Sequence, residues 1–339
     1  MLKNKKILVT GGTGSFGHQI VKRLMGYEPT EIRILSRDEK KQDDMRYLYK
    51  ERDELRFIIG DVRDKDCLRK ATRNVDIIFH AAALKQVPSS EYNPIEAVKT
   101  NILGAQNVVD IALEENVERV IAISTDKAVE PINVMGMSKA IQERIITSTN
   151  QYRDGKRTIF ACVRYGNVLG SRGSVVPLFR KQILSNMQLT LTHADMTRFI
   201  ITLNQAIDLV FTTTKEAIGG EIFVLKMKSH TVKDLADVMI EELRAKNKEV
   251  LITGIRPGEK IHETLVSPAE SIRTVEKGDY YIILPQIIIS EIEKMYPDYK
   301  NSRFFRFSSD NAERLNKAQL KEILKKEGWL DKNSPTPYE

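Results

Sequence analysis

Cysteine is scarce in this sequence, whose 339 residues include only Cys67 and Cys162. Two isolated thiols make neither the paired spacing of a zinc site nor a disulfide framework. They fit a reducing compartment, where such thiols are more often buried packing than chemistry. We therefore expect no metal site and no fold held together by disulfide bonds.

Long hydrophobic runs are also missing. No window of the sequence approaches the roughly 18 consecutive apolar residues that a membrane span requires. The first predicted strand, within KILVTGG, begins in the opening residues, so we expect no signal peptide before it. These absences predict a cytoplasmic protein without a membrane span.

Charge of one sign is not concentrated anywhere in the chain. The 53 basic and 46 acidic residues give a net charge of +7 and are interspersed, apart from short runs such as KNKK at 3–6. A nucleic-acid binder gathers its basic residues into a stripe and interleaves them with aromatic side chains. The distribution instead favours a solvated surface with a site for a phosphorylated ligand, and we expect no nucleic-acid partner.

The first half of the chain alternates short β-rich runs with helical patterns such as 95–116. The predicted strands are 5–10, 31–36, 55–60, 75–82, 117–124 and 158–165. Continuous apolar strands that alternate with helices indicate a parallel sheet buried on both faces, and right-handed crossovers make it doubly wound. The expected fold class is α/β, a Rossmann-like doubly wound parallel sheet.

The second half is less regular and predicts a smaller α/β C-terminal lobe that binds the substrate. This lobe would fold onto the carboxyl edge of the sheet, with part of its chain returning to the first domain. We expect residues 1–165 with about 203–228 in the Rossmann domain, and residues 166–202 with 229–339 in the lobe.

A glycine-rich segment, VTGGTGSFGHQIVKRL, joins the first predicted strand to the first predicted helix. Gly11 would allow a sharp turn, Gly14 a close approach of the backbone to a pyrophosphate, and Gly17 close packing of helix on strand. The helix N-terminus adds N–H groups and the positive end of its dipole. Such glycines also occur in ordinary turns, but their place between strand and helix predicts a dinucleotide site that includes Thr13, Ser15 and Phe16.

The end of the second predicted strand, ILSRDEKK, bears on the choice between NAD and NADP. A carboxylate there would bind the ribose 2′-hydroxyl of NAD, but Ser36 stands in its place. Arg37 follows and can hold a 2′-phosphate with two hydrogen bonds, with Lys41 one turn further on. Asp38 could instead cap the next helix. We expect NADP rather than NAD.

Residues after the third and fourth predicted strands complete the expected cofactor site. Asp61 and Val62 would flank the adenine, and AAALK at 81–85 would line the ribose and nicotinamide. The remaining predicted cofactor residues are Ala81, Ala82, Ala83, Lys85, Asn101 and Lys139.

Several motifs together carry a resemblance to one family. They are TGGTGSFG, SRDEKKQDDM, GDVRD, HAAALKQVP, STDKAVEPIN, GMSKA, RYGNVLGSRGSVVPLF, MTRF and RPGEKIHETL. In this order they resemble the inverting UDP-N-acetylglucosamine 4,6-dehydratases, extended short-chain dehydrogenase/reductases of capsule, O-antigen and flagellin-sugar biosynthesis. The resemblance covers nearly the whole chain.

This resemblance implies a hydro-lyase that uses and restores bound NADP within one turnover. Hydride would leave C4 of UDP-N-acetylglucosamine, or of a related UDP-sugar, and the resulting ketone would acidify the C5 proton. A base would then remove that proton while an acid helps the 6-hydroxyl leave as water. Return of hydride to C6 and reprotonation of C5 on the opposite face would give a 4-keto-6-deoxy-L-hexosamine, so C5 epimerisation is included.

The segment STDKAVEP at 124–131 follows the fifth predicted strand, at the edge where such folds bind ligands. By the family pattern Asp126 would be the acid for C6 and Lys127 the base at C5. An apolar site would raise the pKa of the carboxyl group and lower the pKa of the ammonium group. In an exposed loop, by contrast, the pair would interact weakly.

A methionine stands where short-chain dehydrogenases usually carry the tyrosine of Tyr-x-x-x-Lys. Lys139 would still bind the nicotinamide ribose, unless the helix is plain core and this lysine is solvated, but Met135 cannot take a proton. Loss of activity is one explanation, although some capsule enzymes of the family also have methionine here. Our hypothesis is that Lys127, made partly neutral by burial, serves at both C4 and C5, while Thr125 binds the sugar O4 with Tyr92 or a water as relay.

The resemblance also assigns residues to the sugar nucleotide. Two arginines could hold a pyrophosphate with charge-assisted bonds, and a glutamate could accept from the uridine hydroxyls, although each of these arginines alone would be an ordinary surface residue. The predicted substrate residues are Lys85, Asn167, Ser174, Val175, Arg198, Arg256 and Glu259.

Two other functions stay open at this point. A UDP-hexose 4-epimerase on the same fold needs the same hydride removal but no acid for C6, and a non-catalytic relative would bind nucleotides without releasing water. The aliphatic helices predicted at 95–116 and 133–150 could form a bundle between subunits. We expect a homo-oligomer, a dimer or hexamer as in the family.

Overall fold

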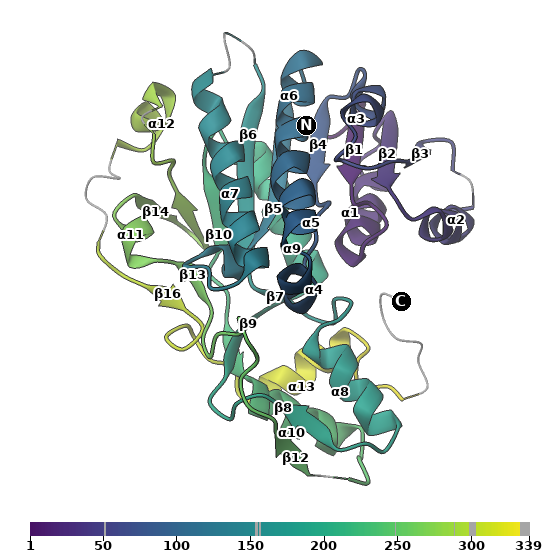
Figure 1. The fold of residues 1–339 in the computed structure, drawn as a ribbon, viewed down its shortest axis with the longest axis vertical. Coiled ribbons are helices and arrows are strands. Elements are labelled where there is room, and N and C mark those ends of the chain that lie inside the picture. Colours follow the sequence, from purple (N-terminus) through teal and green to yellow (C-terminus); the bar gives the residue numbers. More distant parts are fainter. Residues whose placement is uncertain are drawn as a thin grey trace.

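The computed structural model describes residues 1–50, 52–152, 155, 157–247, 249–287, 289–297 and 303–332. Its larger part is a nine-stranded sheet in the order β14-β15-β10-β6-β5-β4-β1-β2-β3 (Figure 1). The strands are β1 (Lys6–Thr10), β2 (Glu31–Ser36), β3 (Leu55–Ile59), β4 (Ile77–His80), β5 (Arg119–Thr125), β6 (Ile159–Tyr165), β10 (Ile222–Leu225), β14 (Thr274–Lys277) and β15 (Tyr280–Ile283). All strands from β3 to β10 in this order run parallel, and β15 pairs antiparallel with both of its neighbours.

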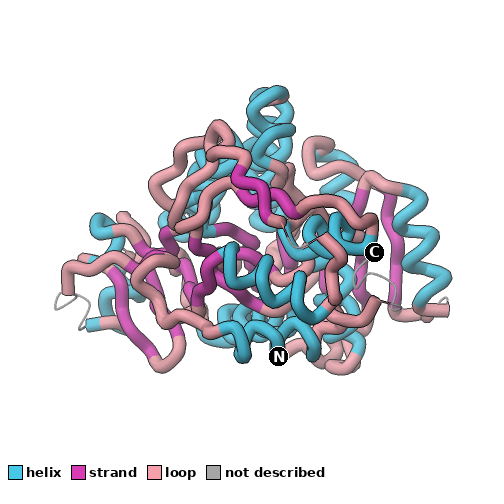
Figure 2. The backbone as a smooth tube through the Cα atoms, turned by 90° about the horizontal axis from the view of Figure 1, so that it is seen from below, coloured by secondary structure: helices cyan, strands magenta, loops and turns pink. Residues whose placement is uncertain are grey.

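Helices cover both faces of the sheet. On one face α6 contacts both α3 and α7, and on the other face hydrogen bonds from Gln19 to Asn204 and from Arg23 to Asp208 join α1 to α9. The helices of this part are α1 (Ser15–Met25), α2 (Glu39–Leu48), α3 (Lys65–Thr72), α4 (Val87–Tyr92), α5 (Pro94–Ala97), the π-helix η1 (Val98–Leu103), α6 (Gly104–Glu114), the 3₁₀-helix η2 (Asp126–Ala128), α7 (Val134–Ser148), the 3₁₀-helix η3 (Thr149–Tyr152), α9 (Leu203–Glu216), α11 (Pro268–Ser271) and α12 (Ser290–Met295). Seen from below, helices lie on either side of the row of strands (Figure 2). The predicted Rossmann-like doubly wound α/β fold is confirmed.

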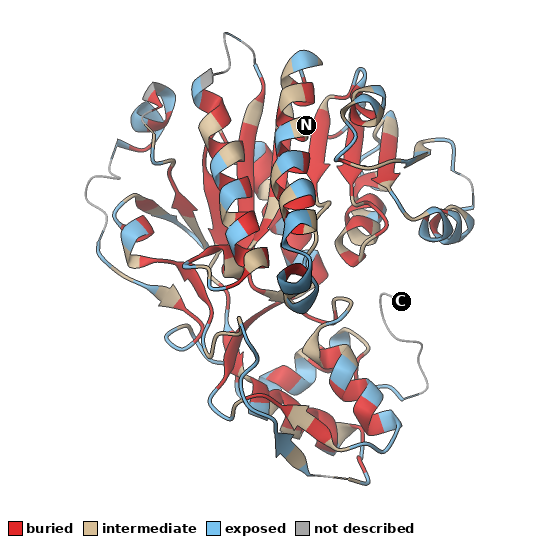
Figure 3. Ribbon diagram, in the orientation of Figure 1, coloured by how far each residue is buried: buried red, intermediate tan, exposed pale blue. Residues whose placement is uncertain are grey.

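The centre of the sheet is the main hydrophobic core (Figure 3). Ile7, Leu8 and Val9 on β1 are fully buried, as are Ile78 and Phe79 on β4. Neighbouring side chains of a strand point to opposite faces, so full burial of consecutive residues requires a covered face on each side. The continuous apolar runs of the sequence therefore correspond to strands between two helical layers.

One segment differs from the domain division expected from the sequence. Residues 274–283 lie in the stretch 229–339 assigned to the lobe, but β14 and β15 extend the large sheet beside β10. Ile282 and Ile283 are fully buried there. The hairpin covers an edge of the parallel sheet that would otherwise leave its backbone groups unpaired.

The smaller lobe has a second hydrophobic core of its own, drawn from residues 169–200, 232–245 and 315–329. Its elements are β7 (Asn167–Val168), α8 (Val175–Leu184), β8 (Leu189–Leu191), β9 (Thr197–Ile201), β11 (Ser229–Thr231), α10 (Val232–Glu242), β12 (Val250–Ile252) and α13 (Lys317–Lys326). A short sheet of β11, β9 and β7 and the pair formed by β13 (Thr264–Val266) and β16 (Phe307–Ser308) lie between the two cores (Figure 1).

None of the helices in the described ranges combines the length and the apolar character that a membrane span needs.

Candidate active site

A cavity of about 860 Å³ opens along the carboxyl ends of β1, β2, β4, β5 and β6. Open α/β sheets bind their ligands at this edge. The predicted cofactor residues that line it are Gly11, Thr13, Gly14, Ser15, Phe16, Gly17, Ser36, Arg37, Asp38, Lys41, Asp61, Val62, Ala81, Ala82, Ala83, Lys85 and Lys139. The structure thus brings together residues from five separate segments of the chain.

The glycine-rich loop needs its glycines for steric reasons. Gly11 has a φ of +68°, and a Cβ added to it would lie 2.8 Å from the backbone nitrogen of Ala82. A Cβ on Gly17 would lie 2.3 Å from the carbonyl carbon of Gly12. The loop can therefore approach β4 and helix α1 can pack against the loop only because these side chains are absent.

Ser36, and not an acidic residue, ends β2 beside the cavity. Its hydroxyl group shares a 2.7 Å hydrogen bond with the hydroxyl group of Thr13. Arg37 is half exposed and lies 3.6 Å from Asp61. The carboxylate of Asp38 accepts from the backbone N–H of Lys41 at 3.0 Å, so Asp38 caps α2 as the alternative interpretation proposed. Arg37 and Lys41 therefore stand beside the end of β2, and each is paired with an aspartate, Arg37 with Asp61 and Lys41 with Asp38 at 2.6 Å.

Asn101 differs from its predicted role because it lies behind the wall of the cavity. Its side chain is fully buried, accepts from the N–H of Leu84 at 2.8 Å, and donates to Ser138 at 2.9 Å. Asn101 therefore links the loop after β4 to α7. It could affect a bound cofactor only through that loop.

Strand β5 delivers the predicted catalytic group. Thr125 ends the strand and donates to Asp126 Oδ1 at 2.9 Å, and Lys127 Nζ lies 3.0 Å from the same oxygen. Lys127 also donates to Asn167 Oδ1 at 3.2 Å and lines the cavity, whereas Asp126 is fully buried. The acid and base expected from the sequence form a contact pair at the cavity, not an exposed surface pair.

The charge state of Lys127 corrects the sequence hypothesis, which expects burial to make this amine partly neutral. Burial does act to lower the pKa of Lys127, but the charges of Asp126 and Glu263 outweigh it and raise the pKa above the ordinary value of 10.5. Glu263 Oε1 lies 3.5 Å from Lys127 Nζ. At neutral pH Lys127 is therefore an ammonium ion held between two carboxyl groups.

Helix α7 forms the next wall. Lys139 is buried and donates to the carbonyl oxygen of Ile123 at 2.5 Å and to Gln142 Oε1 at 2.8 Å, so it is not a solvated surface lysine. Burial lowers its pKa to about 8. Met135 is also buried and lines the cavity one turn earlier, so a thioether and not an ionisable group stands at this point of the wall.

Tyr92 cannot serve as the proton relay that the sequence suggested. It ends α4 and is 88% exposed. Val87 and Pro88 of the same helix line the cavity instead, so the helix turns its first residues to the site and its last to solvent.

The predicted substrate residues divide into two groups. Asn167 and Ser174 line the cavity, Val175 begins α8 beside them, and Lys85 donates to the carbonyl oxygen of Arg172 at 2.9 Å. Asn167 and Ser174 lie between β6 and α8, Val175 is the first residue of α8, and Lys85 reaches this segment from the loop after β4.

The second group lies outside the cavity wall, with Arg256 and Glu259 on the segment 256–263 and Arg198 on β9 beside it. Arg198 is buried, and its guanidinium donates to the carbonyl oxygens of Ile261 and Lys260 at 2.9 Å each. It lies 3.6 Å from Glu259, whose carboxylate accepts from the backbone N–H of Arg256 at 3.3 Å. In this structure Arg198 holds the segment in place, because its donors are directed to the backbone.

Two functional candidates were missed by the sequence reasoning. Arg172 lines the cavity from the lobe, and Glu263 contacts Lys127. Both lie inside motifs quoted for the resemblance, SRGS and HETL, but a motif does not show which of its side chains faces the site.

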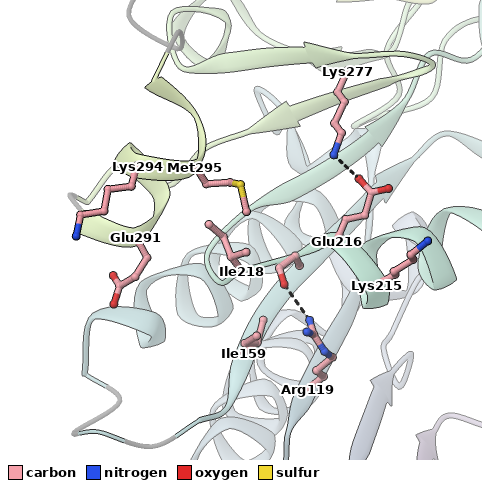
Figure 4. Close-up of a pocket in the computed structure, with 10 residues that line it drawn as sticks. Arg119, Ile159, Lys215, Glu216, Ile218, Lys277, Glu291, Lys294 and Met295 are labelled. Carbon is pink, nitrogen blue, oxygen red and sulfur yellow. Dashed lines mark hydrogen bonds and ion pairs between the residues drawn. The ribbon is translucent and has the colours of Figure 1, made fainter. Parts of the chain in front are cut away.

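A second hollow of about 810 Å³ lies at the opposite edge of the sheet, beside the first residues of β5 and β6 (Figure 4). Three of its charged side chains already have partners: Lys277 lies 2.8 Å from Glu216, and Arg119 donates to the carbonyl oxygen of Ala217 at 2.8 Å. None of the predicted site residues lines it, so the first cavity is the candidate active site.

A glycine-rich strand–loop–helix unit beside a buried lysine on α7 defines a Rossmann-type protein of the extended short-chain dehydrogenase/reductase class. A family model described as polysaccharide biosynthesis protein matches residues 7–285. The chain belongs to this family.

Similar proteins agree over nearly the whole length. An inverting UDP-N-acetylglucosamine 4,6-dehydratase of Campylobacter jejuni is 43% identical over 333 residues, 96% of this chain and 97% of that protein. A UDP-glucose 4-epimerase of Rickettsia felis is 42% identical over 334 residues, 96% of each chain. The X-ray structure of Pen from Bacillus thuringiensis matches with a TM-score of 0.91 and 38% identity, covering 98% of this chain and all (100%) of that one.

Proposed function

We propose that this protein is an NADP-dependent UDP-N-acetylglucosamine 4,6-dehydratase that inverts C5 and supplies surface polysaccharide or glycoprotein glycan synthesis. The observation that carries the proposal is the contact of Asp126 with Lys127 at the cavity, 3.0 Å apart. Removal of the C5 proton and departure of the 6-hydroxyl require a base and an acid close together. The 43% identity to the Campylobacter dehydratase supports the same reaction.

The cavity fits a nicotinamide dinucleotide phosphate. The hydroxyl group of Ser15 at the start of α1 lines it and has no hydrogen-bond partner among the described residues. A phosphate oxygen would supply that partner, because buried hydroxyls are nearly always hydrogen-bonded. With the basic side chains of Arg37 and Lys41 near the ribose, NADP is favoured over NAD.

The glycine-rich loop and Lys139 would hold NADP, and the chemistry that it would supply there is hydride transfer from C4 of the sugar and back to C6. The residues of the chain would handle the protons. Lys127 would take the proton of the C4 hydroxyl and pass it to Asp126, which would deliver it to the C6 oxygen as water leaves. Lys127 would then remove the C5 proton and release it to solvent, and C5 would regain a proton from water on the opposite face. Lys139 would hold the nicotinamide ribose, and Thr125, which already holds Asp126, would orient the sugar at O4.

The lobe would hold the UDP part of the substrate. Asn167 and Ser174 are placed for its phosphates, with Val175 at the start of α8 behind them. Arg198, Arg256 and Glu259 would reach the nucleotide only if the segment 256–263 rearranges, since the guanidinium of Arg198 is directed to its backbone. This part of the proposal rests on the family pattern.

A 4-epimerase is the second candidate, because several relatives about 42% identical carry that name. It would need the base but no acid at C6. A non-catalytic relative is the third, since Met135 removes the usual base. The buried pair of Asp126 and Lys127 favours the dehydratase over both.

The test is incubation of the purified protein with NADP and UDP-N-acetylglucosamine carrying deuterium at C4. A dehydratase should place the deuterium in the new C6 methyl group and give a 4-keto-6-deoxy product that absorbs near-ultraviolet light after alkali. Deuterium retained at C4 of an epimerised hexose would establish the epimerase, and unchanged substrate would reject both enzymes.

A further inference from the structure

Glu263 lies directly before β13 and reaches the candidate active site from the side of the lobe. Its exposed fraction is 2%, and its backbone is fixed by two hydrogen bonds with Ser309, at 2.9 and 2.8 Å. Its Oε1 is 3.5 Å from Lys127 Nζ and 3.9 Å from Arg198 Nε. Its Oε2 has no hydrogen-bond partner in the described part of the chain.

This is poor pairing for a buried carboxylate, as another glutamate of the same protein shows. Glu270 receives two hydrogen bonds from Arg164, at 2.8 and 3.1 Å, and another from the Ser267 hydroxyl at 2.9 Å. Burial opposes ionisation of Glu270, but Arg164 lowers its pKa to about 2. Burial and the charge of Asp126 instead raise the pKa of Glu263, because Lys127 and the other cations only partly compensate.

Lys127 needs such a neighbour. As an ammonium ion it cannot act as a base, and its contacts with two carboxyl groups stabilise that form. Asn167 cannot accept a proton, and Asp126 has to deliver one to the C6 oxygen. Both carboxyl groups within 3.5 Å of Lys127 Nζ, those of Asp126 and Glu263, have one oxygen without a hydrogen-bond partner among the described residues. Because Asp126 is needed for the proton that leaves with water, Glu263 is the acceptor that is left for the resting proton of Lys127.

We propose that Glu263 takes the proton of Lys127 and so presents Lys127 to the sugar as a free amine. One N–H bond of the ammonium group breaks and one O–H bond forms on the carboxylate, so an ion pair becomes a neutral pair without change of net charge. Glu263 keeps this proton through the turnover, while the proton of the C4 hydroxyl leaves with water through Asp126. Glu263 acts through Lys127 and is a positioning residue; its role rests on the proposed function.

The charged groups facing Glu263 are Asp126 and Lys127 from η2, Arg198 from β9 and Lys260 from its own segment. In the wild type, acid should stop the reaction by protonating Glu263 from solvent. In Glu263→Gln the resting ammonium group has to lose its proton to solvent, because Asp126 is taken up by the proton that leaves with water, so activity should rise with pH through the pKa of Lys127. Loss of the Glu263 charge also lowers the pKa of Lys127, because burial favours the neutral amine and one fewer anion then stabilises the ammonium form.

The experiment compares Glu263→Gln and Glu263→Asp with Glu313→Gln, an exposed glutamate paired with Lys228. Glu263→Gln should lose kcat at neutral pH on the order of tenfold or more, keep KM for the sugar nucleotide, and recover at alkaline pH. Glu263→Asp should keep the neutral-pH activity in part, and Glu313→Gln all of it. A wild-type pH profile in Glu263→Gln, or equal losses at every pH in both Glu263 variants, would overturn the proposal.

A second readout does not need turnover. With glutamate carboxyl carbons labelled with ¹³C, NMR should show one group with a raised pKa that disappears in Glu263→Gln and moves in Lys127→Met. Absence of this signal overturns proton sharing even in an active enzyme. Its presence in a protein that releases no water would reject the dehydratase and leave the Glu263–Lys127 pair standing.

Discussion

Gly136 of α7 faces the backbone carbonyl of Lys127 so closely that a Cβ on this glycine would lie 2.2 Å from that oxygen. Gly136 also takes part in the N-cap of α7, because its backbone N–H donates to Asn133 Oδ1 at 2.7 Å. The helix that carries Met135 and Lys139 is thereby pressed against the turn that carries the acid and the base. A contact between two backbone segments, at Gly136 and Lys127, therefore joins α7 to the turn that carries Asp126 and Lys127.

Substitution of Gly136 by alanine should therefore disturb both. The neighbouring atom is backbone and cannot swing away, so we expect a loss of about 1–3 kcal/mol in the free energy of unfolding and a fall in turnover. Urea denaturation measures the first effect. Gly26→Ala is the control, because its Cβ would meet nothing nearer than 3.4 Å and its φ is −72°; equal stability of the two variants would contradict the packing argument.

Lys127 and Met135 give a test of the base that separates the two halves of the reaction. Lys127→Ala should abolish both the reduced nicotinamide and the product, with kcat lowered by roughly 10²–10⁴-fold. Adding Met135→Tyr to this variant restores a phenol at the usual position, so reduced nicotinamide should form without loss of water. Absorbance of the reduced coenzyme in a single turnover measures this, and full activity of Lys127→Ala would exclude Lys127 as the base.

Lys127 also shows where sequence reasoning was sufficient and where it was not. The position of Lys127 follows from its place after a buried strand, because parallel strands deliver their carboxyl ends to one edge. Its charge does not, since Glu263 comes from a distant segment whose approach depends on the tertiary fold. The exposure of Tyr92 and the joining of β14–β15 to the sheet were missed for the same reason: neither local pattern nor motif specifies which neighbour a side chain or an edge strand will meet.

The cofactor preference can be tested at Ser36. An aspartate at this position would accept from the ribose 2′-hydroxyl of NAD and repel a 2′-phosphate, so Ser36→Asp should weaken NADP relative to NAD. We expect roughly a tenfold to hundredfold change in the ratio of the two Kd values, since a hydrogen bond to a charged group contributes about 1.5–3 kcal/mol. Calorimetric titration measures both constants, with Arg52→Ala as the control, because this arginine is exposed and paired with Glu54; an unchanged ratio would remove the basis for NADP.

Self-association is testable on the outer face of α7. Met137 and Ile141 are one turn apart and 48% and 47% exposed, and Leu103 of the contacting η1 is 52% exposed. If copies of the chain pack through this face, Ile141→Asp should lower the mass in sedimentation toward a monomer, because association would bury an unpaired carboxylate. Ile272→Asp, 59% exposed elsewhere, should leave the mass unchanged; an unchanged mass in both variants would exclude this face.

The buried triad of Arg164, Glu143 and Glu270 predicts a specific acid sensitivity. The folded-state pKa of Glu270 is about 2, below its ordinary 4.5, so its contribution to stability is complete above pH 4.5 and is lost as pH falls toward 2. Glu270→Gln should cost about 3 kcal/mol at neutral pH, at the lower end for a broken buried pair, because Glu143 still contacts Arg164 at 2.6 Å. The loss should shrink as pH falls through that window, since the wild type then loses the same interaction.

Urea unfolding from pH 7 to 3 measures the difference, and Glu276→Gln on the surface should show almost none. A difference that stays constant over the whole pH range would mean that the substitution acts through packing and not through the charge of Glu270.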